Sequence, residues 1–236
     1  GKRVSKGKAI QNFLPITQDE KITSILPVTK TKKGEVLSLV MITRGGIIKK
    51  VDSKHFEDVR RSGIIAIKLL KDDLLFWVRL AEKGDHIILT TKKGQAIRFK
   101  ETDARQMGRS AQGVRAMRLK KGDQLVGADI ISAKEKDALT LVVSENGFGK
   151  KTKISEYRLQ KRGGSGIKTS KVTLKTGNLV SAKVLSPDLE EIIAISKKGQ
   201  VIRTSLKEIS ELGRATQGVR IMRLDAKDQL ASITCL

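Results

Sequence analysis

The sequence predicts an all-β fold of the propeller type, built from repeated blades of about 50 residues each. The first observation is a turn glycine that recurs at intervals of 48, 53 and 52 residues, at Gly46, Gly94, Gly147 and Gly199. The second is that short apolar runs flank these glycines, whereas no segment sustains a long helical period of 3.6 residues. Each repeat has room for about four short strands, which is the strand content of a propeller blade.

The first expected element of each repeat is a β-hairpin around the turn glycine. Residues 92–98 read Lys-Lys-Gly-Gln-Ala-Ile-Arg, and residues 197–203 read Lys-Lys-Gly-Gln-Val-Ile-Arg. Apolar runs at 87–89 and 192–195 precede these two turns. Two β-rich runs separated by a glycine-containing turn predict a hairpin. A cation also follows the turn glycine by four residues in every copy, at Lys50, Arg98, Lys151 and Arg203.

The second expected element follows another glycine, which lies 17 or 19 residues after the first, at Gly63, Gly113, Gly166 and Gly218. Arginine stands four residues before three of these glycines, at Arg109, Arg162 and Arg214. Apolar and basic residues alternate in the runs 114–119 and 219–224. We expect strands there, with one face on the core and one in solvent. Residues 206–212 are expected to form one short helical turn.

The repeat pattern begins in the middle of a copy. Arg3 and Gly7 reproduce the spacing of arginine and second glycine, and a strand is expected at residues 8–10. We therefore expect a single domain over residues 1–236, in which residues 1–37 are the back half of a truncated repeat. Full repeats are expected at about 38–84, 85–137, 138–189 and 190–236. The ring of blades is then incomplete in this sequence.

The charge of the chain predicts a polyanionic partner. Lysine and arginine number 48 against 25 aspartate and glutamate residues, which gives a net charge of +23. Such a surplus destabilises a compact state by self-repulsion, so the fold itself does not require it. The cations recur along the whole chain, which favours an extended track for nucleic acid. An anionic membrane surface and a simple gain in solubility are the alternatives, although no apolar run approaches the roughly 18 residues of a membrane span.

Neither a metal site nor a catalytic site is expected. The single cysteine, Cys235, has no partner for an intrachain disulfide, which fits a reducing cytoplasm. His55 and His86 lie in unrelated contexts, whereas a zinc site needs several ligands at regular spacing. No nucleophile–base pair or phosphate-binding loop of the P-loop type occurs, and we expect Tyr157 to be a packing residue. No cofactor is expected in this domain.

One repeat carries a distinctive segment before its second glycine. Residues 160–166, here called the box segment, place two cations ahead of three glycines in four positions. Glycine lets a backbone approach a phosphate closely, and free N–H groups can join the cations in an anion-binding concavity. An ordinary flexible surface loop is the alternative. The box segment predicts DNA contacts from Gln160, Lys161, Arg162, Gly163, Gly164, Ser165 and Gly166.

The box segment resembles the Gln-Arg-Arg-Gly-Gly-Lys-Gly motif of the gyrase family. It departs from that motif at Lys161, which replaces an arginine, and at Ser165, which replaces a lysine. The repeats at 108–115 and 213–219 are also typical of this family, as is the segment Lys-Ile-Thr-Ser-Ile-Leu-Pro-Val at 21–28. Over essentially all of its length, the chain is similar to the carboxy-terminal domain of the A subunits of bacterial DNA gyrases.

The resemblance implies a β-pinwheel, a propeller-like ring of four-stranded blades that exchange strands with their neighbours. It further implies a basic rim that wraps double-stranded DNA, so that an ATP-dependent type II topoisomerase introduces negative supercoils. The implied partners are the gyrase B subunit, together with the rest of the A subunit, in an A2B2 enzyme of the bacterial cytoplasm, associated with the nucleoid. Catalysis belongs to other domains. Because the family's principal box lies in the first blade, the box segment here is expected to be a secondary, degenerate copy.

Further candidate DNA contacts share the neighbourhood of the second glycine: Arg60, Arg61, Arg109, Arg115, Lys168, Arg214 and Arg220. Aromatic residues make up only 3% of the chain, whereas readers of single strands and of RNA stack bases on aromatic side chains. The composition therefore favours duplex DNA held by its backbone. Two other functions stay open: the equivalent domain of topoisomerase IV, and a basic propeller-type scaffold for protein interactions.

Overall fold

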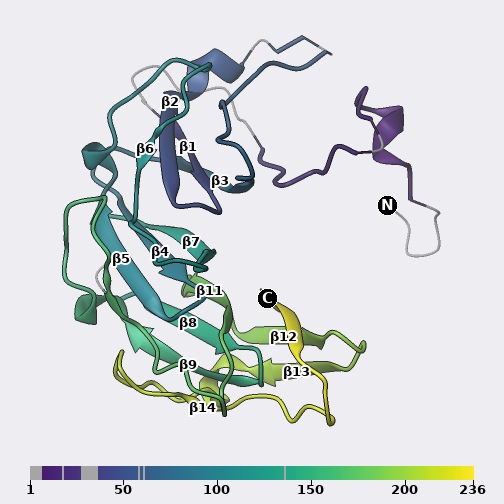
Figure 1. Cartoon of the computed structure of the whole chain (residues 1–236), viewed down its shortest axis with the longest axis vertical. Coiled ribbons are helices and arrows are strands. Elements are labelled where there is room, and N and C mark those ends of the chain that lie inside the picture. Colours follow the sequence, from purple (N-terminus) through teal and green to yellow (C-terminus); the bar gives the residue numbers. More distant parts are fainter. Residues whose placement is uncertain (1–6, 18, 28–36, 58, 61, 136) are drawn as a thin grey trace.

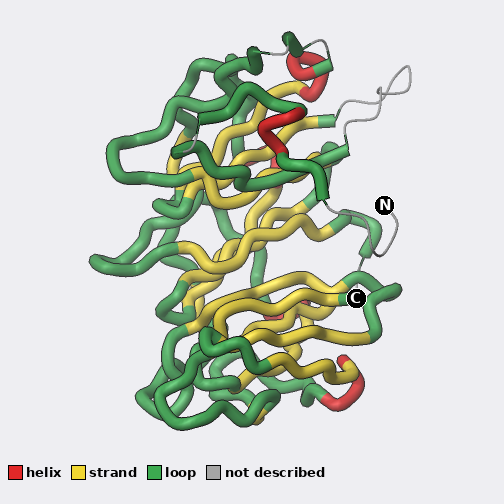
Figure 2. The backbone as a smooth tube through the Cα atoms, turned by 90° about the vertical axis from the view of Figure 1, so that its right-hand side faces the viewer, coloured by secondary structure: helices red, strands yellow, loops and turns green. Residues whose placement is uncertain are grey.

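The computed structural model describes residues 7–17, 19–27, 37–57, 59–60, 62–135 and 137–236. Within these ranges the chain forms fifteen β-strands in four antiparallel sheets, with five short 3-10 turns between them. The sheets follow one another along an open arc (Figure 1). In the perpendicular view their strands stack along the long axis, with loops at the strand ends (Figure 2). The expected all-β, propeller-like fold is confirmed.

Three of the four sheets contain four strands in the described residues. The first has the order β3–β1–β2–β6, with β1 at Ser38–Thr43, β2 at Ile47–Asp52, β3 at Leu75–Ala81 and β6 at Val114–Arg115. The second has the order β10–β5–β4–β7, with β4 at His86–Thr91, β5 at Gln95–Lys100, β7 at Leu125–Ile131 and β10 at Ile167–Lys168. The third has the order β11–β8–β9–β14, with β8 at Leu139–Ser144, β9 at Phe148–Lys153, β11 at Leu179–Leu185 and β14 at Val219–Arg220.

The fourth sheet has three strands in the order β13–β12–β15, with β12 at Glu191–Ser196, β13 at Val201–Ser205 and β15 at Leu230–Cys235. The 3-10 turns are η1 at Ile10–Asn12, η2 at Ser53–Phe56, η3 at Glu101–Asp103, η4 at Ile154–Glu156 and η5 at Leu206–Glu208. No helix in the described ranges is both long and apolar enough to cross a membrane.

All four predicted hairpins are confirmed. The strand pairs β1–β2, β4–β5, β8–β9 and β12–β13 are antiparallel, and each closes over its turn glycine. These glycines have φ between 75° and 87°, a conformation that residues with a side chain rarely adopt. The recurring glycine in the sequence therefore marks the place where each hairpin reverses.

The outer strand of a sheet comes from the following repeat. The two-residue strands β6, β10 and β14 pair with β2, β5 and β9, in registers such as Ile47 opposite Arg115 and Ala96 opposite Ile167. Each outer strand thus bridges two successive repeats. The exchange of strands that the resemblance implied is present in the first three sheets.

Four expected elements were wrong in extent or type. The strands expected at 114–119 and 219–224 are only two residues long, because the chain then leaves the ladder and folds over the neighbouring hairpin turn. Ala116 and Met117, for example, both direct their N–H groups to the carbonyl of Gly46. The turn expected at 206–212 is confined to η5, and residues 8–10 form no strand, since η1 begins at Ile10.

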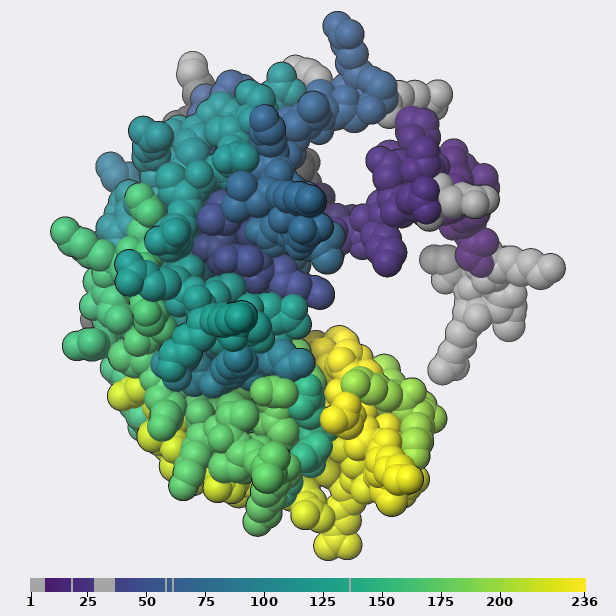
Figure 3. Space-filling model, viewed as in Figure 1, coloured from purple at the N-terminus to yellow at the C-terminus, as the bar shows by residue number. Residues whose placement is uncertain are grey.

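The hydrophobic core lies between successive sheets. Ile42 and Ile48 of the first sheet are fully buried in one cluster with Ile87 and Leu89 of the second. Similar clusters join the later sheets, and the inner strands β3, β7, β11 and β15 line the inside of the arc (Figure 1). The described N-terminal residues 7–17 and 19–27 stand across an opening from the fourth sheet (Figure 3). The inner opening and the outer edge are thus separate surfaces of the arc (Figure 1).

Candidate nucleic-acid interface

The outer edge of the arc presents one cation from each exchanged strand. In β6, β10 and β14 the first residue is a half-buried Val or Ile, and the second is exposed. The exposed residues are Arg115, Lys168 and Arg220, at equivalent places on three consecutive sheets. β6 and β14 lie on the outer side of the arc in Figure 1. These three residues, here called the rim cations, include no member of the box segment.

The second glycine positions each rim cation. Gly113, Gly166 and Gly218 have φ values of 97°, 74° and 85°. A Cβ at Gly113 would lie 2.5 Å from the carbonyl oxygen of Ile48, and one at Gly218 would lie 2.5 Å from that of Gly149. The exchanged strand therefore approaches the hairpin so closely that no side chain fits there. This is why a glycine precedes every exchanged strand by one residue.

Two predicted DNA contacts are held by backbone carbonyls instead of standing free. The guanidinium of Arg162 donates from Nε to the carbonyl oxygen of Asp103 at 2.8 Å and from Nη1 to that of Arg115 at 2.9 Å. Arg214 donates from Nη1 to the carbonyl oxygen of Lys168 at 2.8 Å. Each of these arginines thus holds the exchanged strand of the preceding repeat in place, a role that the sequence pattern did not reveal.

The box segment is tied down along one side. The Gly163 N–H donates to the carbonyl of Ala116 at 2.6 Å, and the Gly164 carbonyl accepts from the N–H of Arg118 at 2.8 Å. Gln160 is half-buried, and its N–H donates to the carbonyl of Arg98. An anion cradle using every N–H of the segment is therefore not formed. The exposed members of the segment are Lys161, Gly164 and Ser165.

The remaining predicted contacts are divided between exposed and undescribed positions. Arg60 and Arg109 are exposed, while Arg61 lies outside the described residues. Sequence reasoning missed further exposed cations in the same repeats as the rim cations, which no motif distinguishes from other surface charges: Arg105, Arg118, Lys120, Arg158, Lys171 and Arg223. The candidate interface is thus a distributed basic edge.

Three of the four cations that follow a turn glycine by four residues have protein partners. The ammonium of Lys50 lies 2.6 Å from a carboxylate oxygen of the buried Glu101. Arg98 donates to the carbonyl of Ile154 at 3.0 Å, and Arg203 donates to Glu191 at 2.6 Å. Lys50 and Arg98 thus face protein groups, whereas the side chain of Arg203 stays mostly exposed beside Glu191.

A histidine shares the surroundings of Arg98. The guanidinium of Arg98 donates to Nδ1 of His86 at 2.8 Å, which requires a neutral imidazole. Burial, followed by the charges of Arg98 and Lys100, lowers the pKa of His86. The ring is therefore an acceptor at neutral pH. In the described part of the chain, no group of three or more His, Cys, Asp or Glu residues is placed to hold a metal ion.

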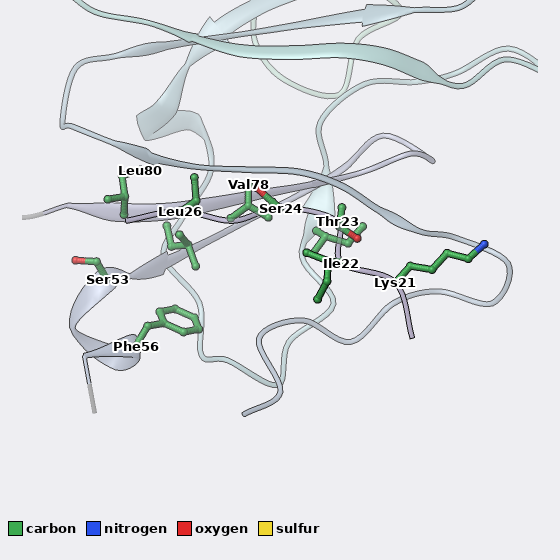
Figure 4. A pocket seen from close by; sticks show the side chains of 11 residues that line it. Lys21, Ile22, Thr23, Ser24, Leu26, Ser53, Phe56, Val78 and Leu80 are labelled. Atoms are coloured by element: carbon green, nitrogen blue, oxygen red, sulfur yellow. The ribbon is translucent and has the colours of Figure 1, made fainter. Parts of the chain in front are cut away.

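A cavity of about 380 Å³ lies between residues 21–26 and the first sheet (Figure 4). Its walls are mainly apolar, from Ile22, Leu26, Phe56, Val78 and Leu80. In the close view Lys21 extends away from these side chains (Figure 4). An apolar wall offers nothing to a phosphate group, so the cavity lies outside the candidate interface.

Comparison with known proteins agrees with this fold. The model of the family described as "DNA gyrase C-terminal domain, beta-propeller" matches residues 37–82, 85–132, 140–186 and 190–236. Of solved structures, a DNA gyrase A C-terminal domain has a TM-score of 0.81 at 32% identity, with 98% of this chain and 75% of that chain covered. The C-terminal domain of a DNA topoisomerase IV has a TM-score of 0.88 at 25% identity, with coverages of 98% and 70%.

Curated relatives share the sequence over nearly its full length. The DNA gyrase A subunit of Ureaplasma parvum is 43% identical over 99% of this chain, and that of Lawsonia intracellularis is 38% identical over 95%. In both cases this chain spans only 27% of the relative's length. The repeated hairpins, the exchanged strands, the match to the family model and these identities lead to one conclusion: the chain belongs to the DNA gyrase C-terminal domain family of β-propellers.

Proposed function

We propose that this domain binds duplex DNA along its outer edge and wraps it, as the DNA-wrapping part of a gyrase A subunit. The observation that carries the proposal is the series of rim cations, one on the exchanged strand of each of three consecutive sheets. Because the sheets follow an arc, cations at equivalent places trace a curved path. The net charge of +23 supports a partner with many phosphate groups.

Wrapping requires contacts that are spread along the path. Bending 20–30 base pairs by 40–90° costs about 1–6 kcal/mol, so a single strong contact does not hold a curved duplex. Duplex DNA carries a charge about every 1.7 Å of axis, and each phosphate that is neutralised releases condensed counterions. A rim with a cation on each of three consecutive sheets offsets the bending cost step by step, without reading the base sequence.

The proposed context is the whole bacterial enzyme in the cytoplasm. There the domain directs the handedness of the DNA crossing, and other domains of the A and B subunits cleave DNA and use ATP in an A2B2 assembly. We assign no catalytic residue and no cofactor to this domain. The gyrase relatives, about four times as long as this chain, support such a division of work.

A second candidate is the equivalent domain of topoisomerase IV. The specific observation in its favour is the TM-score of 0.88 with a topoisomerase IV C-terminal domain. In that role the domain binds DNA with less wrapping. A basic scaffold for protein partners is the alternative outside DNA topology.

The test is a topoisomer assay with this chain. Relaxed plasmid is religated with increasing protein at low and moderate salt, and the linking number is read from a gel. We expect a shift that grows with protein and fades with salt. The variant Arg115→Gln/Lys168→Gln/Arg220→Gln should lose most of the shift, because the curved path loses one contact on each of three sheets.

The matched control removes three exposed cations from turns away from the exchanged strands, as Lys83→Gln/Lys134→Gln/Lys207→Gln. It should keep most of the shift at the same change of net charge. Retention of DNA without any change of linking number would favour the topoisomerase IV role. Weak DNA retention that does not change with salt concentration would contradict the proposed DNA binding. It would favour the scaffold for protein partners.

A further inference from the structure

Two lysines are buried in the hairpins at the same place in their repeats. Lys49 in β2 and Lys150 in β9 each follow the turn glycine by three residues, and both side chains are fully buried. Burial of an ammonium group is unfavourable unless hydrogen bonds compensate for the lost water. The partners of these two groups therefore indicate why the sequence keeps a charge there.

Both ammonium groups bind the backbone of the loop that carries the next arginine. Lys150 Nζ donates to the carbonyl oxygens of Gly213 at 2.5 Å and Arg214 at 2.6 Å, and to Oγ1 of Thr216 at 3.0 Å. Lys49 Nζ donates to the carbonyl oxygens of Ala66 and Arg109. In each case the loop bound at the arginine leads directly into the exchanged strand of the same sheet.

The contact continues from one rim cation to another. Lys150 holds the backbone of Arg214, and the guanidinium of Arg214 holds the carbonyl of Lys168 in β10. The same loop then ends at Gly218 and enters β14 with Arg220. A single buried lysine thus fixes the loop that connects two rim cations on neighbouring sheets.

In the second sheet an apolar residue occupies the position of these two lysines. Ile97 follows its turn glycine by three residues and is fully buried. The loop above it is the box segment, and a Cβ at Gly164 would lie 3.6 Å from Cδ1 of Ile97. A glycine-rich loop can pack directly on an apolar side chain, whereas the loops at 109–112 and 213–216 turn carbonyl groups toward the hairpin. The third residue after the turn glycine is therefore apolar under a glycine-rich loop and a lysine under a loop that presents carbonyl groups.

We propose that Lys49 and Lys150 are positioning residues of the DNA-binding edge, which pin the arginine loops by their carbonyls so that the rim cations face the same path. This inference rests on the proposed function. It assigns to two buried residues, which touch no DNA, an effect on how many phosphate groups the rim neutralises.

The salt dependence of DNA binding tests the proposal. Each phosphate contact contributes about 0.9 to the slope of log K against log salt. Lys150→Met should reduce the magnitude of this slope by about 0.9, the value of one phosphate contact. The charge that it removes is buried, but Arg220 is then no longer held in position to contact a phosphate group. Lys153→Met, which removes an exposed charge from the same strand, is the matched control and should leave Arg220 in place.

A loop exchange separates positioning from simple support of the fold. In the variant Lys150→Ile, residues 214–217 are also replaced by Arg-Gly-Gly-Ser, the sequence at 162–165, so that an apolar residue again lies under a glycine-rich loop. This variant should recover the slope of the unmodified chain. A Lys150→Met protein that melts earlier but keeps the full slope would overturn the proposal, as would failure of the loop exchange to restore the slope in a folded protein.

The pH profile gives an independent reading. Burial lowers the pKa of Lys150 to about 8, while Glu156 raises it and Arg214 lowers it further. Above that pH the loop loses its charged donor, so DNA affinity should fall more steeply for the unmodified chain than for Lys150→Met. The free energy of unfolding should change in the opposite sense, because the unfolded lysine still binds a proton up to about pH 10.5. Parallel loss of stability and affinity would contradict positioning.

These outcomes differ from failure of the proposed function. If the domain did not bind DNA by its outer edge, the triple variant of the rim cations would keep full affinity and a full linking-number shift. If only the positioning role were wrong, the triple variant would lose affinity while Lys150→Met retained it.

Discussion

At the scale of single residues, the second glycine determines where a rim cation stands. Gly218 must adopt φ of 85° and must also admit the carbonyl of Gly149. Gly63 occupies the corresponding place in the first repeat with φ of 74°, but no atom of the described residues lies within 4 Å of a Cβ built there. The two glycines share a backbone conformation, but only Gly218 has another part of the backbone in close contact.

This difference predicts unequal costs for the same substitution. Gly63→Ala should destabilise the domain by about 1–2 kcal/mol, the cost of a left-handed residue with a side chain. Gly218→Ala should cost about 1–3 kcal/mol more, because the new methyl group overlaps a carbonyl of β9. Urea unfolding of both variants measures the difference, and equal midpoints would show that the close approach is not maintained in solution.

Arg162 and Arg214, which the sequence predicts as DNA contacts, also have a structural role. Both guanidinium groups donate to carbonyl oxygens of the preceding repeat, so their first effect is to align exchanged strands. A charge-assisted hydrogen bond of this kind is stronger than one between neutral groups. Loss of DNA binding on substitution of either arginine would therefore report both a lost charge and a displaced rim cation.

At the scale of elements, the exchanged strand joins each sheet to the next repeat. Strands of two residues are weak by themselves, but β6, β10 and β14 each pair with a hairpin. An arginine from the loop of the following repeat also holds β6 and β10. The fourth sheet has no such outer strand in the described residues, so the far edge of β13 lacks a ladder partner there.

Hydrogen exchange tests this asymmetry. Backbone amides on the open edge of β13 should exchange faster than those on the corresponding edge of β9, which β14 covers over two residues. The amides of β12, paired on both sides, serve as the internal control within the same sheet. Equal protection at the edges of β9 and β13 would mean that another segment covers the fourth sheet.

At the scale of the whole molecule, charge and curvature act together. The chain carries a net charge of +23, and the rim cations are distributed over three sheets of an arc instead of being gathered on one sheet. A curved distribution suits a polyanion that bends, whereas a flat patch suits a rigid one. The strength of binding should therefore depend on the number of sheets engaged.

The measurable consequence is the change of salt dependence in the triple variant of the rim cations. Loss of three phosphate contacts should flatten the slope of log K against log salt by about 2.7. The control variant Lys83→Gln/Lys134→Gln/Lys207→Gln should change the slope much less. Identical slopes for the two variants would indicate that net charge alone, and not its arrangement on the outer edge, governs affinity.

The sequence by itself determined the features that depend on near neighbours. Turn glycines and alternating apolar residues are local patterns and the repeat of about 50 residues is visible in the sequence, so the hairpins and the class of fold could be predicted. The family followed from the resemblance of the box segment and the repeats around it. The length of the exchanged strands could not, because Ala116 and Met117 leave the ladder for the distant carbonyl of Gly46.

Only the tertiary structure decided which cations stay exposed on the outer edge. Arg162 and Arg214 find carbonyl partners 47 and 46 residues earlier in the chain, and Lys150 reaches a loop more than 60 residues later. The sequence alone does not distinguish a cation that faces solvent from one that binds a carbonyl group. The fold alone brings donor and acceptor together, and so it separates the cations that organise the outer edge from Arg115, Lys168 and Arg220, which it leaves exposed.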